Sequence, residues 1–321
     1  MRCRKGGKRL EYVVGWDGGG TKTTMKVLDL CGNTVLSEIA GSLNYNSNPK
    51  EEIRNTMITL ITKLRNLSED LSDCKGICIC AAGISNNEAV SFLTSNLEQS
   101  GIQCKITIVG DHEAALYGAF GKPEGIILIS GTGSICFGMN QSEKKARTGG
   151  FGHLIDDEGS GYAIGRDILS TAVQIYDKRV TDSILLELVY EALGVHTVEE
   201  IIHYAYQANW NKACIASLSP LLLKALQLDD SYARAIGEKA SKELVKLVYP
   251  VAKILAMEDG KIALLGGILT HYEPIRTMVV KRLAVELPTL TITKPMYDSA
   301  TGAAIIARNH YINEQGGSCH V

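Results

Sequence analysis

Two short loops rich in glycine and hydroxyl residues, each placed straight after an apolar run, constrain this chain most strongly. The first spans residues 15–24, with the sequence GWDGGGTKTT, and the second spans residues 130–134, with the sequence SGTGS. Glycine lacks a Cβ and tolerates positive φ, so consecutive backbone amides can turn toward an anion while threonine and serine hydroxyls add donors. We interpret the loops as two halves of one phosphate clamp, and their repetition predicts a duplicated architecture.

Strand-like segments flank both loops. Residues 12–16 and 24–30 surround the first loop, and residues 125–129 and 135–139 surround the second. A Walker-type loop needs G-x-x-x-x-G-K-[ST] ahead of a helix, and no stretch here has that spacing. A dinucleotide-binding fingerprint lies between a strand and a helix, whereas these loops lie between paired strands. An ordinary tight hairpin turn stays open for either loop taken alone.

Length and composition bound the remaining possibilities. A chain of 321 residues suggests two domains at about 150 residues each. Hydrophobic residues make up 45% and charged residues 21%, and the formal net charge is −2, so nothing favours a nucleic-acid partner. No apolar segment follows the basic residues near the N-terminus, which predicts a solvated extension rather than a secretory signal, and we expect no membrane partner.

The cysteines point to reduced thiols. Nine cysteines, an odd number without a signal segment, are typical of a cytoplasmic protein rather than of a disulfide framework. Cys78 and Cys80 lie in the strand-like run 77–82, close to Cys74, and no matching pair with zinc spacing occurs elsewhere. We therefore favour core packing over a metal site for these three.

Periodicity predicts an α/β order in the first third of the chain and a mainly helical stretch over residues 159–257. The expected helices are 51–67, 87–99, one starting near 113, 231–257, 274–287 and 299–309, and the further strands are 77–82, 105–109, 261–265 and 290–292. Ala300, Gly302, Ala303 and Ala304 predict a small-residue face where the last helix crosses another.

Seven short motifs follow one another along nearly the whole chain. They are residues 17–23, 81–83, 110–111, 130–134, 149–152, 157–162 and 266–268. In this order they resemble the actin-like sugar kinase and Hsp70 superfamily and, within it, the N-acetylglucosamine kinase branch of the BadF/BadG/BcrA/BcrD ATPase family. The resemblance implies an α/β fold of two ribonuclease H-like (actin-like ATPase) domains with an interdomain cleft. We expect residues 1–120, joined by the C-terminal helix 298–321, to form one lobe, and residues 121–297 to form the other.

The resemblance assigns the glycine loops to the nucleotide. The implied ATP-binding residues are Gly18, Gly19, Gly20, Thr21, Lys22, Thr23, Thr132, Gly133, Gly266 and Gly267. For Gly266 and Gly267 a plain strand-to-helix turn is the alternative. Asp17 would repel phosphate oxygens unless a cation lay between them, and Mg²⁺ takes one or two carboxylates beside nucleotide phosphates, so the resemblance gives Asp17 the metal. A turn-initiating aspartate is the alternative there.

Asp111 ends an apolar strand and precedes a helix, where α/β proteins gather groups that face a ligand. The matching aspartate of the related kinases is the catalytic base, which accepts the proton of the acceptor hydroxyl as the phosphoryl group is transferred. His112 and Glu113 follow directly, and for them a helix start is preferred.

The sugar-binding residues implied by the resemblance are Asn44, Asp111, Thr132, Gly149, Gly150 and Asp157. An amide such as Asn44 can both donate to and accept from a hydroxyl or acetamido group, although a plain loop asparagine is possible. For Asp157 the alternative is a helix N-cap, because it lies just before an expected helix over 159–176. Phe151 and Asp156 depart from the family, which often has tryptophan and glycine there, and this leaves the choice of sugar open.

The implied activity is ATP-dependent phosphorylation of the 6-hydroxyl of an N-acetylated amino sugar, N-acetylglucosamine or N-acetylmuramic acid, with ATP and Mg²⁺ as cofactors. This places the protein in amino-sugar metabolism and cell-wall recycling, as a cytoplasmic homodimer. A glucosamine kinase is one alternative. Another is the ATPase that activates 2-hydroxyacyl-CoA dehydratases, which needs paired cysteines for an iron–sulfur cluster, whereas Cys136 stands in a strand without a convincing second ligand. A sugar-sensing regulator would usually carry a helix-turn-helix, for which the residues ahead of the first strand are too few.

Overall fold

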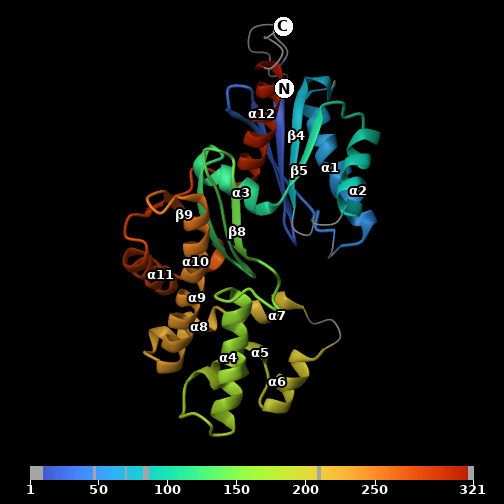
Figure 1. The fold of residues 1–321 in the computed structure, drawn as a ribbon. Coiled ribbons are helices and arrows are strands. Elements are labelled where there is room, and N and C mark those ends of the chain that lie inside the picture. Colours follow the sequence, from blue (N-terminus) through green and yellow to red (C-terminus); the bar gives the residue numbers. More distant parts are fainter. Residues whose placement is uncertain (1–9, 46–47, 69–70, 82–86, 208–210, 317–321) are drawn as a thin grey trace. The chain divides into compact units, whose positions relative to one another are not determined.

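The computed structural model describes residues 10–45, 48–68, 71–81, 87–207 and 211–316. The chain divides into unit 1, residues 1–124 and 295–321, and unit 2, residues 125–294. Each unit is built on its own five-stranded sheet (Figure 1). The two units are described separately below.

The sheet of unit 1 positions two of the predicted carboxylates. Its strands are β1 (Tyr12–Gly18), β2 (Thr23–Asp29), β3 (Thr34–Ala40), β4 (Cys74–Ala81) and β5 (Lys105–Val109), in the order β3-β2-β1-β4-β5. β1, β2 and β3 pair antiparallel, whereas β1, β4 and β5 run parallel. The carboxyl ends of these parallel strands therefore share one edge of the sheet. Asp17 lies at that end of β1, and Asp111 follows β5.

Helices cover both faces of this sheet. They are α1 (Lys50–Leu67), η1 (Leu71–Asp73, a short 3₁₀ turn), α2 (Asn87–Gln99), α3 (Asp111–Phe120) and α12 (Ser299–Gly316). Alternate residues of the central strand β1 point to opposite faces. Val14 and Trp16 join the core under α1, whereas Val13 joins a second core with α3 and α12. Figure 1 accordingly shows α1 and α2 on one side of the sheet and α12 on the other.

The small-residue face of α12 is confirmed. A Cβ added at Gly302 would lie 2.0 Å from the backbone oxygen of Ala114 in α3, and one added at Gly15 would lie 2.2 Å from the backbone nitrogen of Ala304. Only backbones without side chains between them can approach so closely. The helix also runs to Gly316, well past its predicted end at residue 309.

Unit 2 repeats the architecture of unit 1. Its strands are β6 (Gly125–Ser130), β7 (Ser134–Met139), β8 (Lys145–Gly149), β9 (Lys261–Leu265) and β10 (Thr291–Thr293), in the order β10-β9-β6-β7-β8. β6, β7 and β8 are antiparallel, and β6, β9 and β10 are parallel, so order and direction match those of unit 1. The predicted duplication and the two-domain ribonuclease H-like fold are confirmed. β8 was not predicted, because its sequence KARTG lacks an apolar alternation.

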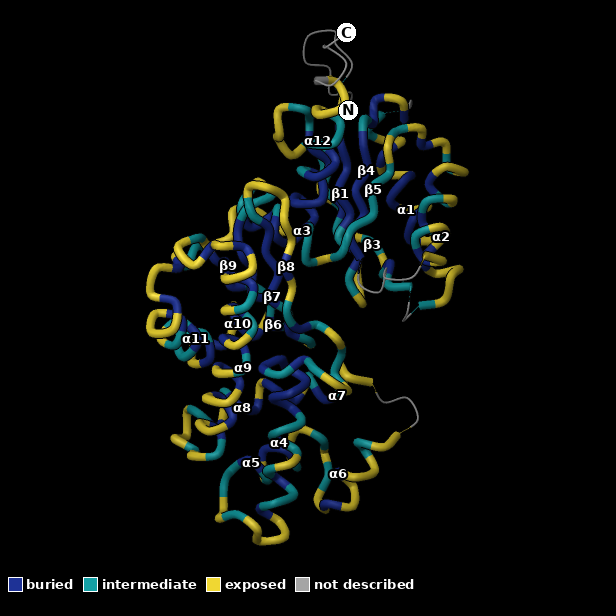
Figure 2. Tube along the Cα trace, viewed as in Figure 1, coloured by how far each residue is buried: buried dark blue, intermediate teal, exposed yellow. Residues whose placement is uncertain are grey.

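Helices occupy most of the chain between β8 and β9, as predicted, and two more follow β9. They are α4 (Gly161–Tyr176), α5 (Leu185–Leu193), α6 (Val198–Ala205), α7 (Lys212–Ala216), α8 (Leu221–Gln227), α9 (Ser231–Leu255), α10 (Gly267–His271) and α11 (Glu273–Glu286). One side of α9 is buried in the core of the unit through Leu244, Val248 and Val251 (Figure 2). The five-residue helix α10 is too short for a periodic pattern and was not predicted.

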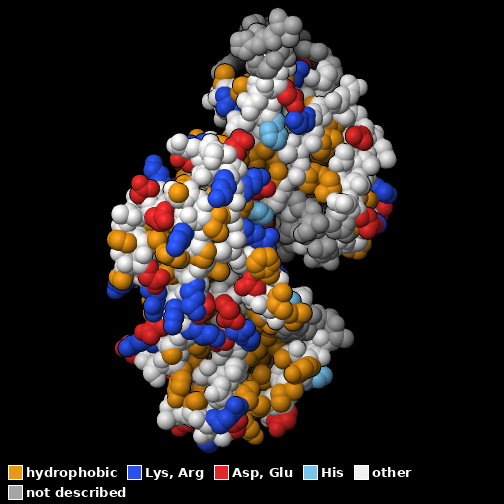
Figure 3. Space-filling model, viewed as in Figure 1, with side chains coloured by type: hydrophobic (Ala, Val, Ile, Leu, Met, Phe, Trp, Pro, Cys, Tyr) orange, Lys and Arg blue, Asp and Glu red, His pale blue; other side chains and the backbone are white. Residues whose placement is uncertain are grey.

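Two predicted helix starts were wrong by two residues. α4 begins at Gly161 rather than at 159, because the Ser160 hydroxyl accepts a hydrogen bond from the Ala163 amide at 3.2 Å and caps the helix. α3 begins at Asp111 rather than near Glu113. Within the described residues no helix is long and apolar enough to cross a membrane. Figure 3 shows acidic and basic side chains interspersed over the visible face of unit 2, in keeping with the small net charge.

Candidate functional site

The first glycine loop closes the β1–β2 hairpin in unit 1. The Gly19 amide donates to the Lys22 carbonyl at 2.9 Å, which makes a tight turn. Gly20, Thr21 and Lys22 are exposed at its tip, where a ligand can reach them. Gly18 and Thr23, by contrast, are paired with each other in the sheet and are buried. The tip rather than the base of the hairpin is thus accessible to a ligand.

Asp17 occupies an environment that suits a cation. Burial, followed by the negative charges of Asp111 and Asp298, raises the pKa of its carboxyl to about 6, although the hydrogen bond from Cys80 and the charge of Lys22 act in the opposite direction. The carboxylates of Asp111 and Asp298 therefore both act on Asp17, and the excess negative charge around it is what a bound divalent ion would neutralise. Asp298 was not predicted. It caps α12 by accepting from the Thr301 amide at 2.8 Å and lies 3.6 Å from Lys26 Nζ.

This pKa shift predicts how stability depends on pH. The folded-state pKa lies above the ordinary value of 3.8, so the stabilisation that accompanies the bound proton is complete below about pH 4 and is lost as the pH rises through about 6. Asp17→Asn mimics the protonated form. We expect this variant to melt at a higher temperature than the unsubstituted protein at pH 8 without Mg²⁺, with the difference disappearing near pH 4.

Thermal melts over this pH range test the prediction. Asp182→Asn, which changes a carboxylate whose side chain is 87% exposed, serves as the control and should show no such pH-dependent gain. Addition of Mg²⁺ with ADP at pH 8 should raise the melting temperature of the unsubstituted protein more than that of Asp17→Asn. Equal melting temperatures at pH 8 would contradict the assignment of Asp17.

Asp111 lies at the first position of α3, after Gly110. Its Oδ1 atom accepts a hydrogen bond from the His112 amide at 2.9 Å, and 61% of its side chain is exposed. The carboxylate is therefore held at a helix N-terminus and remains open to a substrate. The preferred interpretation of His112 and Glu113 as part of a helix start agrees with their positions in the first turn of α3.

The Ser42 hydroxyl joins the first glycine loop to the loop that carries Asn44. It donates to the Gly19 carbonyl at 2.8 Å and accepts from the Asn44 amide at 3.0 Å. It also accepts from the Asn48 side chain at 2.8 Å, and the same Asn48 amide nitrogen donates to the Asn44 carbonyl at 3.0 Å. A Cβ added at Gly20 would lie 3.9 Å from Asn44 Nδ2. The implied nucleotide and sugar loops are thus neighbours that share a set of hydrogen bonds.

Ser42→Ala should separate these loops. The substitution removes the acceptor of the Asn44 amide hydrogen bond and one of the two acceptors of Asn48 Nδ2, at a cost of about 1–3 kcal/mol, so we expect the KM for the sugar to rise by about 10-fold. Steady-state kinetics with the sugar varied would measure this. Ser37→Ala, on the exposed edge strand β3, is the control and should keep the KM unchanged. An unaltered KM in Ser42→Ala would show that the loop holds its shape without the hydroxyl.

The second glycine loop connects β6 to β7 in unit 2 and is fastened to the segment that precedes α4. Ser130 Oγ donates to the Gly159 carbonyl at 2.9 Å, and Ser134 Oγ donates to the Glu158 carbonyl at 2.8 Å. The Gly161 amide donates to the Gly131 carbonyl at 2.7 Å. Thr132, between these anchors, is exposed. The loop is therefore rigidly held while its central residue stays available.

Asp157 lies against this loop and is not the N-cap of α4. Its residue is only 3% exposed, with a φ of 65°, in the region that side chains rarely adopt. Its Oδ1 atom accepts from the Ser134 amide at 3.3 Å, and a Cβ at Gly133 would lie 3.0 Å from either carboxylate oxygen. A side chain at residue 133 would therefore crowd the carboxylate. Ser160 takes the cap, so the N-cap interpretation of Asp157 was wrong.

Gly149 ends β8 and Gly150 follows it, with φ values of 73° and 75°, and Gly149 is buried whereas Gly150 is half-buried. Arg147 holds them, because its guanidinium donates to the Gly149 carbonyl at 3.0 Å and to the Gly150 carbonyl at 2.6 Å. The same guanidinium lies 4.7 Å from the centre of the Phe151 ring, and the Asp156 carboxylate accepts from the Phe151 amide at 3.0 Å. The two departures from the family pattern therefore stabilise one loop.

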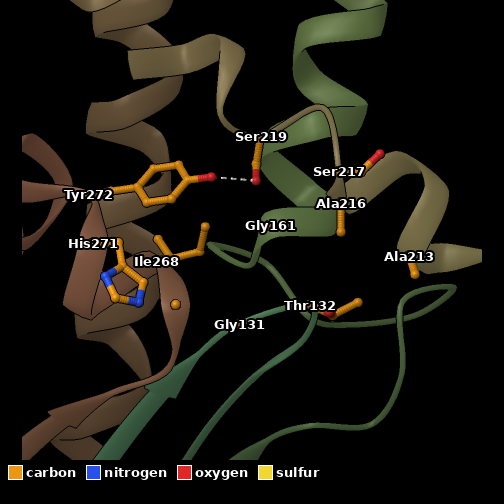
Figure 4. A pocket seen from close by; sticks show the side chains of 11 residues that line it. Gly131, Thr132, Gly161, Ala213, Ala216, Ser217, Ser219, Ile268, His271 and Tyr272 are labelled. Carbon is orange, nitrogen blue, oxygen red and sulfur yellow. Dashed lines mark hydrogen bonds between the residues drawn. The ribbon is translucent and has the colours of Figure 1, made fainter. Parts of the chain in front are cut away.

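A pocket of about 420 Å³ opens beside the second glycine loop in unit 2 (Figure 4). Ligand pockets commonly have volumes of this order. Tyr272 and Ser219 close its back wall with a hydrogen bond of 2.9 Å between their hydroxyls. The lining residues are Gly131, Thr132, Gly161, Ala213, Ala216, Ser217, Ser219, Gly267, Ile268, His271 and Tyr272.

The predicted pair Gly266 and Gly267 has two separate tasks. Gly267 lines the pocket, and a Cβ placed there would meet no atom within 4 Å. Gly266 has φ 87° and ψ 156°, and a Cβ placed there would lie 2.3 Å from the Ser130 carbonyl oxygen. Gly266 therefore lets β9 lie against the end of β6, as a strand-to-helix turn requires, while Gly267 faces the space for a ligand.

Several residues of these surroundings were missed by the sequence analysis. Ser42, Asn48, Arg147 and Asp298 were not predicted as site residues. The small residues from α7 that line the pocket were not predicted either, because alanine and serine are common in any helix. Of the expected motif at residues 81–83, residues 82 and 83 lie outside the described part of the chain.

A comparison with known families matches residues 14–307 to the BadF/BadG/BcrA/BcrD ATPase family. The chain belongs to this family. It is similar to the N-acetylmuramic acid/N-acetylglucosamine kinase of Clostridium acetobutylicum, with 38% identity over 94% of this chain and 99% of the relative. It is also similar to the N-acetyl-D-glucosamine kinase of Dictyostelium discoideum, with 30% identity over 93% of this chain and 98% of the relative. The resemblance to this sugar kinase branch is confirmed.

A solved structure supports the fold assignment. It belongs to a protein of Chromobacterium violaceum described as an N-acetylglucosamine kinase candidate, and it aligns with a TM-score of 0.75 and 22% identity. The alignment covers 92% of this chain and 99% of that chain. At this level of identity the likeness concerns the fold, and both units take part in it.

Proposed function

We propose that this family member is an ATP-dependent kinase that phosphorylates the 6-hydroxyl of N-acetylglucosamine or N-acetylmuramic acid. The observation that carries the proposal is the placement of Asp17 and Asp111 at one edge of the unit 1 sheet, close enough for the charge of Asp111 to raise the pKa of Asp17. A phosphoryl transferase needs these two tasks side by side, a carboxylate for the metal and a carboxylate for the acceptor proton. The amino-sugar kinase names of the relatives support the same class.

In this proposal unit 1 handles the phosphates and the acceptor hydroxyl. The exposed tip of the first loop, Gly20, Thr21 and Lys22, binds the phosphate oxygens, and Asp17 holds Mg²⁺, which neutralises charge on the phosphates when bound. Asp111 accepts the proton of the sugar 6-hydroxyl while the hydroxyl oxygen forms a bond to the γ-phosphorus and the bond from that phosphorus to ADP breaks. Asn44 orients the sugar, and the Ser42 hydrogen bonds keep it next to the phosphate-binding tip.

Unit 2 supplies the remaining contacts. We assign the adenosine to the pocket lined by Gly267, His271 and Tyr272, and a phosphate to Thr132 at its edge. Gly149 and Gly150 offer backbone groups to the sugar. The carboxylate of Asp157 accepts from the sugar hydroxyls and also keeps the Ser134 amide in place. We assign Gly133 to the nucleotide, and its lack of a side chain leaves room for the Asp157 carboxylate.

The decisive experiment measures ADP release with MgATP against a panel of N-acetylglucosamine, N-acetylmuramic acid, glucosamine and glucose. We expect strong acceleration by one or both N-acetylated sugars, and no phosphorylation of their 6-deoxy analogues. Identification of the product by phosphorus–proton correlated NMR would locate the phosphate on the primary hydroxyl. A preference for glucosamine would make glucosamine the substrate in place of the N-acetylated sugars, and failure of every sugar to accelerate ADP release would overturn the proposal.

The homodimer and the cytoplasmic location stay predictions. Light scattering, which measures the molar mass in solution, would test for the homodimer.

A further inference from the structure

Two cysteines at the start of neighbouring strands form a thiol pair away from the proposed site. Cys74 begins β4, and Cys104 directly precedes β5. These parallel strands pair in a register that sets Gly76 opposite Lys105. The two sulfur atoms lie 3.6 Å apart. Both thiols are unbridged in this structure.

The strand geometry allows a covalent bond between them. The register places Cys104 opposite residue 75, so Cys74 lies one position along on the neighbouring strand. With strands about 4.8 Å apart and a rise of about 3.3 Å per residue, the two Cα atoms are roughly 6 Å apart, within the range of about 4.4–6.8 Å that disulfides adopt, so side-chain rotations can bring these sulfurs to bonding distance. Carboxyl ends of β1, β4 and β5 carry the proposed site, whereas Cys74 and Cys104 lie at the opposite, amino ends. The pair is therefore independent of the proposed function.

We propose that Cys74 and Cys104 form a reversible, oxidisable pair, a modification site at which small-molecule disulfides such as glutathione disulfide introduce one intramolecular disulfide bond. The two thiols differ in exposure, because Cys104 is half-buried and Cys74 is only 3% exposed. An external oxidant can therefore reach Cys104, while Cys74 can react only with its neighbour.

The electrostatics of the pair support this division of roles. The hydrogen bond with Cys74 lowers the pKa of the Cys104 thiol, whereas the hydrogen bond with Cys104, together with burial, raises the pKa of the Cys74 thiol. Thiolates rather than thiols attack disulfides, so Cys104 is the attacking group and Cys74 the resolving group.

The exchange balances in two steps. The Cys104 thiolate attacks one sulfur of glutathione disulfide, the sulfur–sulfur bond breaks, and one glutathione thiolate leaves with the electron pair. Cys74 then loses its proton to water and attacks the Cys104 sulfur, and the second glutathione leaves. Two protein thiols are oxidised, and one molecule of glutathione disulfide is reduced to two thiols.

The bond would close a loop that contains β4 and α2. Cross-linking restricts the unfolded chain, so oxidation should raise the melting temperature by several degrees, and dithiothreitol should reverse the rise. All of the site residues proposed above lie outside residues 74–104.

The test treats the folded protein with glutathione disulfide, blocks remaining thiols by alkylation and maps the peptides by mass spectrometry. We expect a Cys74–Cys104 cross-linked peptide in the unsubstituted protein and in Cys31→Ser, the control for an exposed thiol. In Cys104→Ser, the cross-link and the rise in melting temperature should both be absent, with Cys74 alkylated only after denaturation.

Two results would overturn the proposal, and both are read from the unsubstituted protein, whatever the folding of the variants. The first is a stable glutathione adduct on Cys104 while Cys74 stays a thiol. The second is modification of Cys31 with neither Cys74 nor Cys104 oxidised.

Discussion

Asp111→Asn should lower the turnover number by about 10²–10⁴ while leaving sugar binding nearly unchanged. An amide cannot accept the proton of the acceptor hydroxyl, but its oxygen can still bond to the His112 amide, which the carboxylate contacts at 2.9 Å. With 61% of the side chain exposed, the substitution leaves no cavity. The loss is therefore expected in the chemical step.

Steady-state kinetics and calorimetric titration of the sugar would separate these effects. Glu113→Gln, which makes the same chemical change two residues along in the first turn of α3, is the matched control and should keep most of its turnover. Because the charge of Asp111 raises the pKa of Asp17, the Asn variant should also bring that pKa closer to 3.8. Near-normal turnover in Asp111→Asn would remove this carboxylate from the mechanism.

Gly266→Ala should destabilise unit 2 by about 3–5 kcal/mol, the sum of backbone strain and an overpacked contact. The backbone at φ 87° and ψ 156° is accessible essentially to glycine alone. The new methyl group would lie 2.3 Å from the Ser130 carbonyl oxygen, and Ser130 anchors the second glycine loop. Relief of this contact would displace that loop, so MgATP affinity should fall together with stability.

Gly267→Ala is the matched control. It adds the same methyl group one residue along, where no atom lies within 4 Å, so it should unfold in urea at nearly the same concentration as the unsubstituted protein. Any loss of nucleotide affinity in this control would come from the pocket itself. Equal urea midpoints for both variants would show that β9 can shift without cost.

The spacing of apolar residues predicted the helices and strands with strong periodicity correctly. The bounds predicted for α2, β5 and β9 match the structure, because each has a clear apolar pattern between polar turns. β8 and α10 were missed because a strand of five residues at a sheet edge and a helix of five residues bury too little to show a pattern. The start of α4 was misplaced because Gly159 and Ser160 are both of a residue type that can cap a helix. Only the hydrogen bond from the Ala163 amide to the Ser160 hydroxyl distinguishes them.

The predicted site residues were found from different kinds of sequence pattern. Asp111 was found from its position between an apolar strand and a helix, and Asp17 was found as a carboxylate within a glycine loop that faces phosphates, while the resemblance gave both their roles. The charge of Asp111 raises the pKa of Asp17, which agrees with neighbouring positions in the structure. Gly266 and Gly267 were found as a pair, but their separate tasks depend on the contact with Ser130, more than a hundred residues away in the chain. Thr23 was assigned to the nucleotide with its loop, and pairing with Gly18 buries it at the base of the hairpin.

The sequence by itself determined the duplicated hairpins, the glycine loops and the strand-end carboxylates, because each depends on backbone demands within a few neighbouring residues. Only the tertiary structure decided that Ser42 joins Gly19 to Asn44, that Asp157 lies over Gly133, and that the sulfurs of Cys74 and Cys104 are 3.6 Å apart. These contacts link segments some 20 to 30 residues apart. Their partners are small or polar residues that leave no periodic pattern in the sequence, so packing within each unit had to bring them together.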